Sequence, residues 1–159
     1  MTALKDISYT TVSHLNESWD ALRRIENYEV VTGTILFQKF FTDCPKGKTL
    51  FGFNANIEPS SPLILKSRRF LMHASYFVQM IDTSLTMLGP GVEILTEIMT
   101  ELGEKHARMG VESEMYPIMC EALVYAIERA TGESFSSASR KAWKEFFAGI
   151  SNSMIQAGK

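Results

Sequence analysis

The sequence predicts an all-α fold of about six main helices joined by short turns. Apolar residues recur at every third or fourth position over most of the chain, which marks one face of a helix rather than a strand. Turn-forming residues separate these stretches, and strands do not alternate with helices. Because the chain has 159 residues and is 45% hydrophobic, we expect a single domain, residues 1–159, with a sizeable core.

The N-terminal half predicts three of these helices. The first two cover residues 11–26 and 28–43, and a short turn follows at residues 45–50. Residues 54–62 contain two prolines and predict a loop. The apolar face of the third helix comprises Phe70, His73, Phe77, Ile81 and Leu85.

The C-terminal half predicts three more helices. A Leu-Gly-Pro-Gly turn at residues 88–91 precedes the fourth helix. Gly110 and Gly132 are placed to end the fourth and fifth helices, and Ser136 or Ser137 is placed to cap the last one. The apolar faces of the three comprise, in order, Val92, Leu95, Met99, Leu102 and His106; Tyr116, Met119, Leu123 and Ile127; and Trp143, Phe147, Ile150 and Met154.

Composition excludes several classes of function. The net charge of -2 and the lack of a large basic cluster argue against nucleic acid or anionic lipid as a partner. No stretch reaches the roughly 20 apolar residues that a membrane-spanning helix needs. The N-terminus has no apolar signal core, so we expect an intracellular, cytoplasmic protein in which Cys44 and Cys120 are free thiols.

Two of the three histidines lie on apolar helix faces. His14 falls in a polar stretch, whereas His73 and His106 each belong to an apolar stripe. A zinc site needs three or four ligands, which two histidines do not supply. A haem iron needs only one or two axial ligands, because the porphyrin supplies the other four. Spacing alone leaves two interpretations open, namely histidines of an ordinary core and axial ligands of a haem.

The residues around His106 resemble a known family. The run LGEKHARMGV, residues 102–111, is similar to the proximal segment of globins, in particular neuroglobins. Other segments match in the family's order: residues 33–41 for the second helix, 45–51 for the short third helix, 67–82 for the distal helix, and 121–128 and 142–143 for the last two. The resemblance runs from about residue 19 to residue 154 and implies a globin fold around a haem pocket.

The resemblance assigns roles to individual residues. His106 is implied to be the proximal ligand of the iron of haem b, iron protoporphyrin IX. Its other ring nitrogen is implied to form a hydrogen bond with a backbone carbonyl or a nearby side chain. His73 is implied to be the distal histidine, which hydrogen-bonds a bound gas or binds the iron itself. The apolar wall of the pocket is implied to comprise Phe37, Phe51, Phe77, Val111, Tyr116 and Phe147.

The chain departs from the family's pattern in two places. Tyr76, a weaker and neutral partner, stands where neuroglobin-like chains carry a lysine that reaches a haem propionate, so the propionates are expected to depend instead on Arg108, Lys66 or Arg69. Phe77 stands where many globins have valine or leucine. Its bulk is expected to narrow the distal pocket and slow diatomic ligands.

The resemblance implies reversible binding of O2, CO and NO at a haem iron. Without a gas, His73 and His106 are expected to bind the iron together, and we expect an oxygen-binding or oxygen-transport protein, a monomer or homodimer, rather than a dedicated enzyme. One alternative is NO dioxygenation or nitrite reduction, which needs electrons from a partner reductase. Another is a haem-free sensor or interaction domain, against which the presence of His106 argues.

Overall fold

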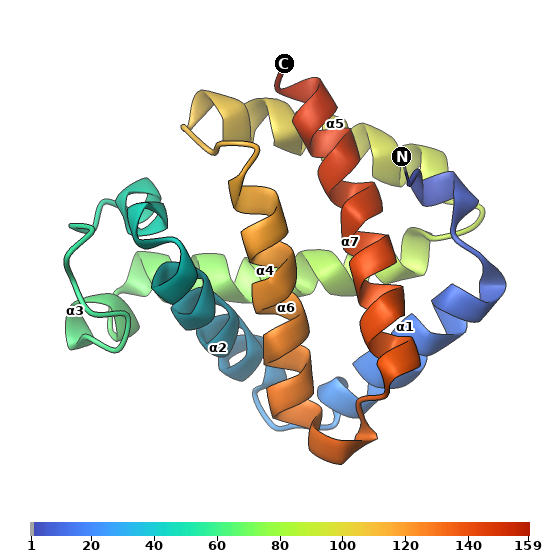
Figure 1. Ribbon diagram of the computed structural model, residues 1–159, viewed down its shortest axis with the longest axis horizontal. Coiled ribbons are helices and arrows are strands. Elements are labelled where there is room, and N and C mark those ends of the chain that lie inside the picture. The colour runs from blue at the N-terminus through green and yellow to red at the C-terminus, as the bar shows by residue number, and fades with distance from the viewer. Residues whose placement is uncertain (1) are drawn as a thin grey trace.

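Six long helices make up most of residues 2–159, the part of the chain that the computed structural model describes (Figure 1). They are α1 (Tyr9–Arg23), α2 (Tyr28–Asp43), α4 (Arg68–Met87), α5 (Val92–Arg108), α6 (Met115–Thr131) and α7 (Ser137–Ala157). Shorter elements are the 3-10 turns η1 (Leu4–Asp6), η2 (Pro45–Phe51) and η3 (Gly132–Ser134) and the single α-helical turn α3 (Pro62–Leu65). The all-α prediction is confirmed. In the described part of the chain, no helix has the length and apolar character needed to cross a membrane.

Serine side chains start several of these helices. Ser8, Ser67 and Ser136 each accept a hydrogen bond from the backbone N–H three residues later, which satisfies a donor that has no partner within the helix. The cap at Ser136 confirms one of the two predicted starts of the last helix. The cap at Ser8 starts α1 two residues before the predicted boundary at residue 11.

Other boundaries differ from the prediction because of local backbone geometry. Helix α1 ends at Arg23 rather than at residue 26, and Asn27 adopts a left-handed conformation with φ 58° before α2 begins. Pro62 belongs to α3 rather than to the preceding loop, since Ser61 caps this turn and proline is favoured at the first helical position. Helix α7 ends at Ala157, three residues beyond Met154, the last residue of its predicted apolar face.

Close helix crossings fix the positions of α4 and α5. Figure 1 shows α6 and α7 side by side with α4 crossing behind them, and the most extensive interfaces pair α5 with α7, α2 with α6, and α2 with α4. A Cβ atom on Gly33 of α2 would lie 2.7 Å from the carbonyl oxygen of Ala74 of α4. A Cβ atom on Gly103 of α5 would collide with the backbone of Met154 of α7. Glycine therefore lets both crossings come close together, beside His73 and His106 respectively.

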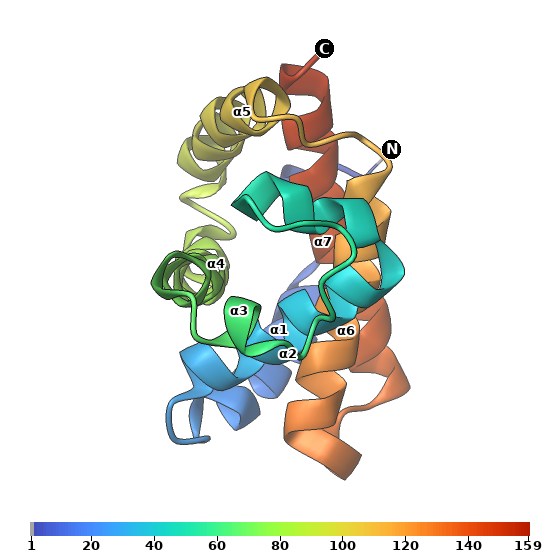
Figure 2. The ribbon, with the colours of Figure 1, turned by 90° about the vertical axis from the view of Figure 1, so that its left-hand side faces the viewer.

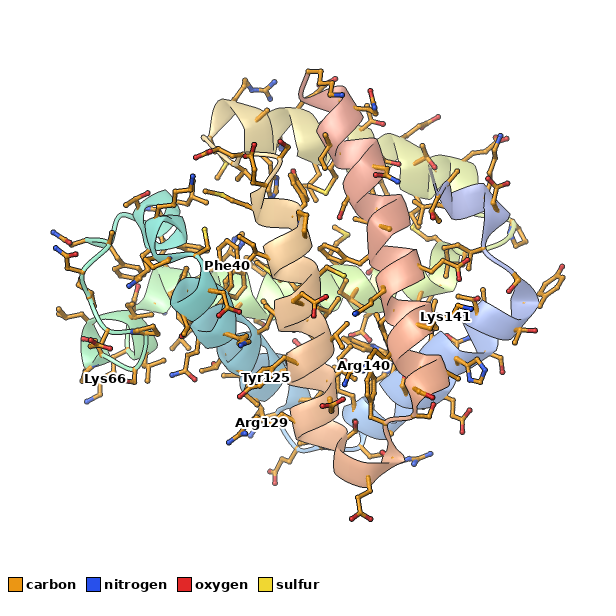
Figure 3. All side chains as sticks on the ribbon, viewed as in Figure 1. Phe40, Lys66, Tyr125, Arg129, Arg140 and Lys141 are labelled. Carbon is orange, nitrogen blue, oxygen red and sulfur yellow. The ribbon has the colours of Figure 1, made fainter. Side chains whose placement is uncertain are left out.

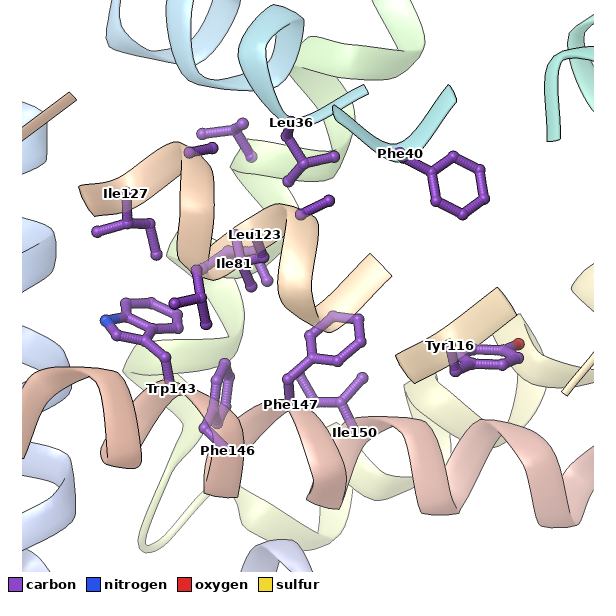
Figure 4. Packing of buried hydrophobic residues seen from close by; sticks show 14 of the residues in the cluster. Leu36, Phe40, Ile81, Tyr116, Leu123, Ile127, Trp143, Phe146, Phe147 and Ile150 are labelled. Carbon is purple, nitrogen blue, oxygen red and sulfur yellow. The ribbon is translucent and has the colours of Figure 1, made fainter. Parts of the chain in front are cut away.

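The core between α6 and α7 is aromatic and aliphatic. Trp143, Phe146 and Phe147 of α7 face Leu123 and Ile127 of α6 (Figure 4). The Trp143 indole Nε1 donates a 2.8 Å hydrogen bond to the Oγ of Ser18, so the one polar atom of this buried ring has a partner. The core therefore ties α1 to the α6–α7 pair.

A buried lysine holds the loop between η2 and α3. Lys48 is only 4% exposed, and its Nζ donates hydrogen bonds of 2.7 and 2.6 Å to the carbonyl oxygens of Ala55 and Ile57. A buried ammonium group needs such partners because its desolvation is costly. The loop is thereby fastened to the turn that carries Phe51.

Candidate functional site

A cavity of about 310 Å³ lies between α2, α4, α5, α6, α7 and the turn η2. Figure 2 shows α4 and α5 on one side of the molecule, with η2 facing them. Small-molecule and cofactor sites typically have volumes of about 300–1,000 Å³ and a mostly apolar lining. Phenylalanine, methionine and branched aliphatic side chains dominate this lining, so the cavity suits a large apolar ligand.

His106 reaches the cavity from the last turn of α5. Its Nδ1 lies 2.8 Å from the carbonyl oxygen of Leu102, which can only accept a hydrogen bond, so Nδ1 carries the proton. Burial lowers the pKa of His106, although this hydrogen bond acts in the opposite direction. The ring is therefore neutral near pH 7, and the lone pair of its Nε2 is available to a metal.

His73 reaches the same cavity from α4. Its ring packs edge-to-face against Phe51 and Phe37, with ring centroids 5.0 and 5.6 Å away. Burial lowers the pKa of His73, and the charges of His106 and Arg69 lower it further. Two neutral imidazoles on separate helices thus line one apolar cavity.

Phenylalanines form the wall around His73. The Phe37 ring lies 5.5 Å from Phe51, 5.8 Å from Phe77 and 5.9 Å from Phe70, in each case nearly edge-to-face. Edge-to-face contacts add to the stabilisation from buried area and restrict ring orientation. Residues from α2, η2 and α4 therefore hold this side of the cavity in a defined shape.

The structure brings most of the residues expected at the site together. On the cavity wall it places His73, His106, Phe37, Phe51, Tyr76, Phe77, Val111, Tyr116 and Phe147, and also Arg69. Arg108 and Lys66 are exposed and do not line the cavity. Arg108 lies two positions after His106, about 200° around the helix, so it points away from the cavity. Figure 3 shows Lys66 at the outer edge of the molecule beside α3.

Sequence reasoning assigned no individual methionine to the site. Six of the nine methionines line the cavity: Met80, Met99, Met109, Met115, Met119 and Met154. Three of them, Met99, Met119 and Met154, lie on the predicted apolar stripes and offered a signal. Met109 and Met115 flank the turn between α5 and α6, outside any periodic stripe. Methionine is flexible and polarizable, so it can shape itself to an irregular ligand.

These residues fit a haem. The group is a flat apolar macrocycle, and its iron requires one or two axial nitrogen ligands. The cavity offers an apolar lining and two neutral imidazoles. The hydrogen bond from His106 to Leu102 fixes the tautomer and orientation of one ring, as is usual for histidines that bind metals.

Comparisons with known proteins agree with this geometry. Residues 34–154 match the family model described as Globin. Neuroglobin of Danio rerio is 26% identical over 142 residues, which cover 89% of this chain and 86% of the relative. Neuroglobin of Tetraodon nigroviridis is 28% identical over 137 residues, which cover 86% of this chain and 83% of the relative.

Solved structures share the fold at lower identity. A hexacoordinated heme protein from an anhydrobiotic tardigrade has a TM-score of 0.82 and 18% identity, covering 96% of both chains. A globin of Drosophila melanogaster has a TM-score of 0.78 and 18% identity, covering 94% of both chains. The predicted arrangement of the helices as a globin fold is confirmed.

Proposed function

Because this chain belongs to the globin family, we propose that it holds haem b between His106 and His73 and reversibly binds O2, CO and NO. The observation that carries the proposal is the pair of neutral imidazoles on α4 and α5 that line one apolar cavity. When bound, haem supplies an iron whose sixth coordination position can exchange a histidine for a gas. The role we propose is cytoplasmic gas binding rather than dedicated catalysis.

His106 is the proposed proximal ligand. The Leu102 carbonyl accepts a hydrogen bond from its Nδ1, which leaves Nε2 as the donor atom for iron and makes the ring more basic. The backbone N–H of Val111 donates to the His106 carbonyl at 2.9 Å and fastens the turn that follows α5. Both contacts restrict the motion of the proximal ring.

His73 is the proposed sixth ligand when no gas is present. Within residues 2–159 its ring has contacts with phenylalanine rings and no hydrogen-bond partner that would compete with iron. Two of the similar solved structures, from a tardigrade and from Drosophila melanogaster, are described as hexacoordinate. A gas would then compete with His73, so the apparent affinity would equal the intrinsic affinity multiplied by the fraction of molecules in which His73 is not bound to the iron.

The phenylalanine wall has a separate task. Phe37, Phe51 and Phe77 present ring edges and faces rather than polar groups to the cavity. They exclude water from the space beside His73. A dry pocket would protect a reduced iron from oxidation, and it would strengthen the hydrogen bond that His73 would donate to a bound gas.

Optical titration of the apoprotein with haem tests the proposal. We expect the wild type to take up one haem per chain and develop a strong Soret band. We expect His106→Gly to lose that band and to regain it when free imidazole is added, because imidazole replaces the missing ligand. His14→Gly is the matched control, since it introduces the same helix-weakening residue in α1, away from the cavity.

Two results would contradict the proposal. Failure of the wild type to take up haem would favour a haem-free interaction domain. If His106→Gly took up haem with the spectrum and affinity of the wild type, His106 would not be a ligand of the iron.

A further inference from the structure

We propose that Arg69 is the carboxylate-binding residue at the mouth of the cavity, where it holds a propionate group of the bound haem. The inference rests on the proposed function, because it takes haem as the ligand. Haem carries two propionates on one edge of an otherwise apolar ring. A site for it therefore needs a cation at one edge of an apolar cavity.

Arg69 is that cation. Among the residues that line the cavity in the described chain, it is the only lysine, arginine, aspartate or glutamate. The ion pairs between residues 2 and 159 do not include it, so its guanidinium is available. A guanidinium presents a planar fork of N–H donors that matches the two oxygens of a carboxylate.

The position of Arg69 on α4 gives it the right reach. Arg69, His73 and Tyr76 stand at i, i+4 and i+7, so they share one face of the helix. His73 is half-buried, whereas Arg69 is exposed and Tyr76 is 57% exposed. The side chains on this face therefore change from exposed at Arg69 to half-buried at His73 within about one helical turn. A ligand centred beside His73 meets Arg69 at its solvent edge.

Tyr76 is another polar side chain at the exposed rim of the cavity. The Tyr76 hydroxyl, on the same rim, can donate only one neutral hydrogen bond. Arg69 is therefore the stronger carboxylate partner of the two.

The neighbouring cations cannot take this role from their present positions. Lys66 and Arg108 are exposed and off the cavity wall. Arg68 lies about 100° around the helix from Arg69 and does not line the cavity. The Lys48 ammonium is already bonded to two loop carbonyls.

The test combines each of two proteins, wild type and Arg69→Met, with each of two cofactors, haem and haem dimethyl ester. Arg69→Met removes the guanidinium, and haem dimethyl ester removes the propionate charges. The rate of haem loss from the ferric protein to an excess of an apoglobin acceptor is measured for all four combinations. We expect either change alone to speed haem loss by about threefold to tenfold, as for a partly exposed charge-assisted pair.

The decisive measurement is the loss of haem dimethyl ester from Arg69→Met. If Arg69 holds a propionate, esterification speeds haem loss from the wild type and has little further effect in Arg69→Met, because the partner is already gone. Arg68→Met is the matched control, an exposed arginine one position away, and should lose haem and its ester at the wild-type rates.

Failure of this inference differs from failure of the proposed function. Equal rates for Arg69→Met and Arg68→Met, or an undiminished effect of esterification in Arg69→Met, would overturn the role of Arg69 while haem binding stands. A wild type that takes up neither haem nor its ester would overturn both.

Discussion

Asp82 of α4 shows how single residues fasten the helix that carries His73. Its carboxylate accepts hydrogen bonds from the Trp19 indole Nε1 and from the Tyr28 hydroxyl, the latter at 2.6 Å. The Arg23 side chain lies 3.7 Å away, in a partly exposed ion pair that adds little stability. Asp82 therefore links α1, α2 and α4 through charge-assisted hydrogen bonds.

The pKa of Tyr28 provides a test of this network. Burial, the hydrogen bond to Asp82 and the nearby negative charges raise the pKa of Tyr28 to about 12. The folded state favours the neutral phenol, so the stability it contributes is complete below the unfolded pKa of about 10 and is lost as pH rises towards 12. When phenolate absorbance is followed against pH, the contribution of Tyr28 is the wild-type curve minus the Tyr28→Phe curve. The midpoint of this difference curve should lie near pH 12. A difference midpoint near the ordinary value of about 10, with helicity intact by circular dichroism, would contradict the network.

Phe77 tests the shape of the pocket at the same scale. It lies one helical turn after His73 and packs 5.8 Å from Phe37. Replacing it with valine removes a ring from the cavity wall, so gas association after flash photolysis should become faster by about tenfold, or roughly 1.4 kcal/mol of barrier. Met72→Leu, a change on the exposed side of α4, should leave the rate unchanged. An unchanged rate in Phe77→Val would show that this ring does not limit access.

Helix crossings set the position of His106, the proposed proximal ligand. Gly103 lies almost one turn before His106, and a Cβ atom there would collide with the α7 backbone at Met154. Gly103→Ala should therefore destabilise the protein by about 1–3 kcal/mol in urea denaturation, because the crossing must open. Glu104→Ala, on the exposed face of α5, should change stability by less than about 0.5 kcal/mol. Equal stabilities for the two variants would show that α5 and α7 do not depend on this close approach.

Helix periodicity explains which parts of the site could be predicted. His73, Phe77 and His106 lie on apolar stripes, and burial of one stripe from each helix brings them to the same cavity. Arg108 is near His106 in sequence but on the opposite side of α5, so proximity along the chain was misleading. Met109 lies beyond the end of α5, and its place on the wall depends on how the turn folds over the cavity. That tertiary detail leaves no periodic signal.

At the scale of the whole molecule, the cavity links stability to the ligand. A ligand that binds only the folded state stabilises it by about 2.7 kcal/mol at a free concentration 100 times its Kd. Haem should accordingly raise the Tm by roughly 5–10 °C for a chain of this size. The increase should be much smaller in His106→Gly. Thermal melts with and without haem measure both, and equal Tm values for apoprotein and haem-saturated wild type would contradict the assignment of the cavity.

The central claim is that His73 and His106 both bind the iron when no gas is present. The most direct test is the visible absorption spectrum of the reduced, gas-free protein, recorded for the wild type and for His73→Leu. We expect a strong Soret band with sharp, resolved visible bands in the wild type, and one broad five-coordinate band in the variant. A broad five-coordinate band already present in the wild type would contradict the claim, because His73 would then be away from the iron.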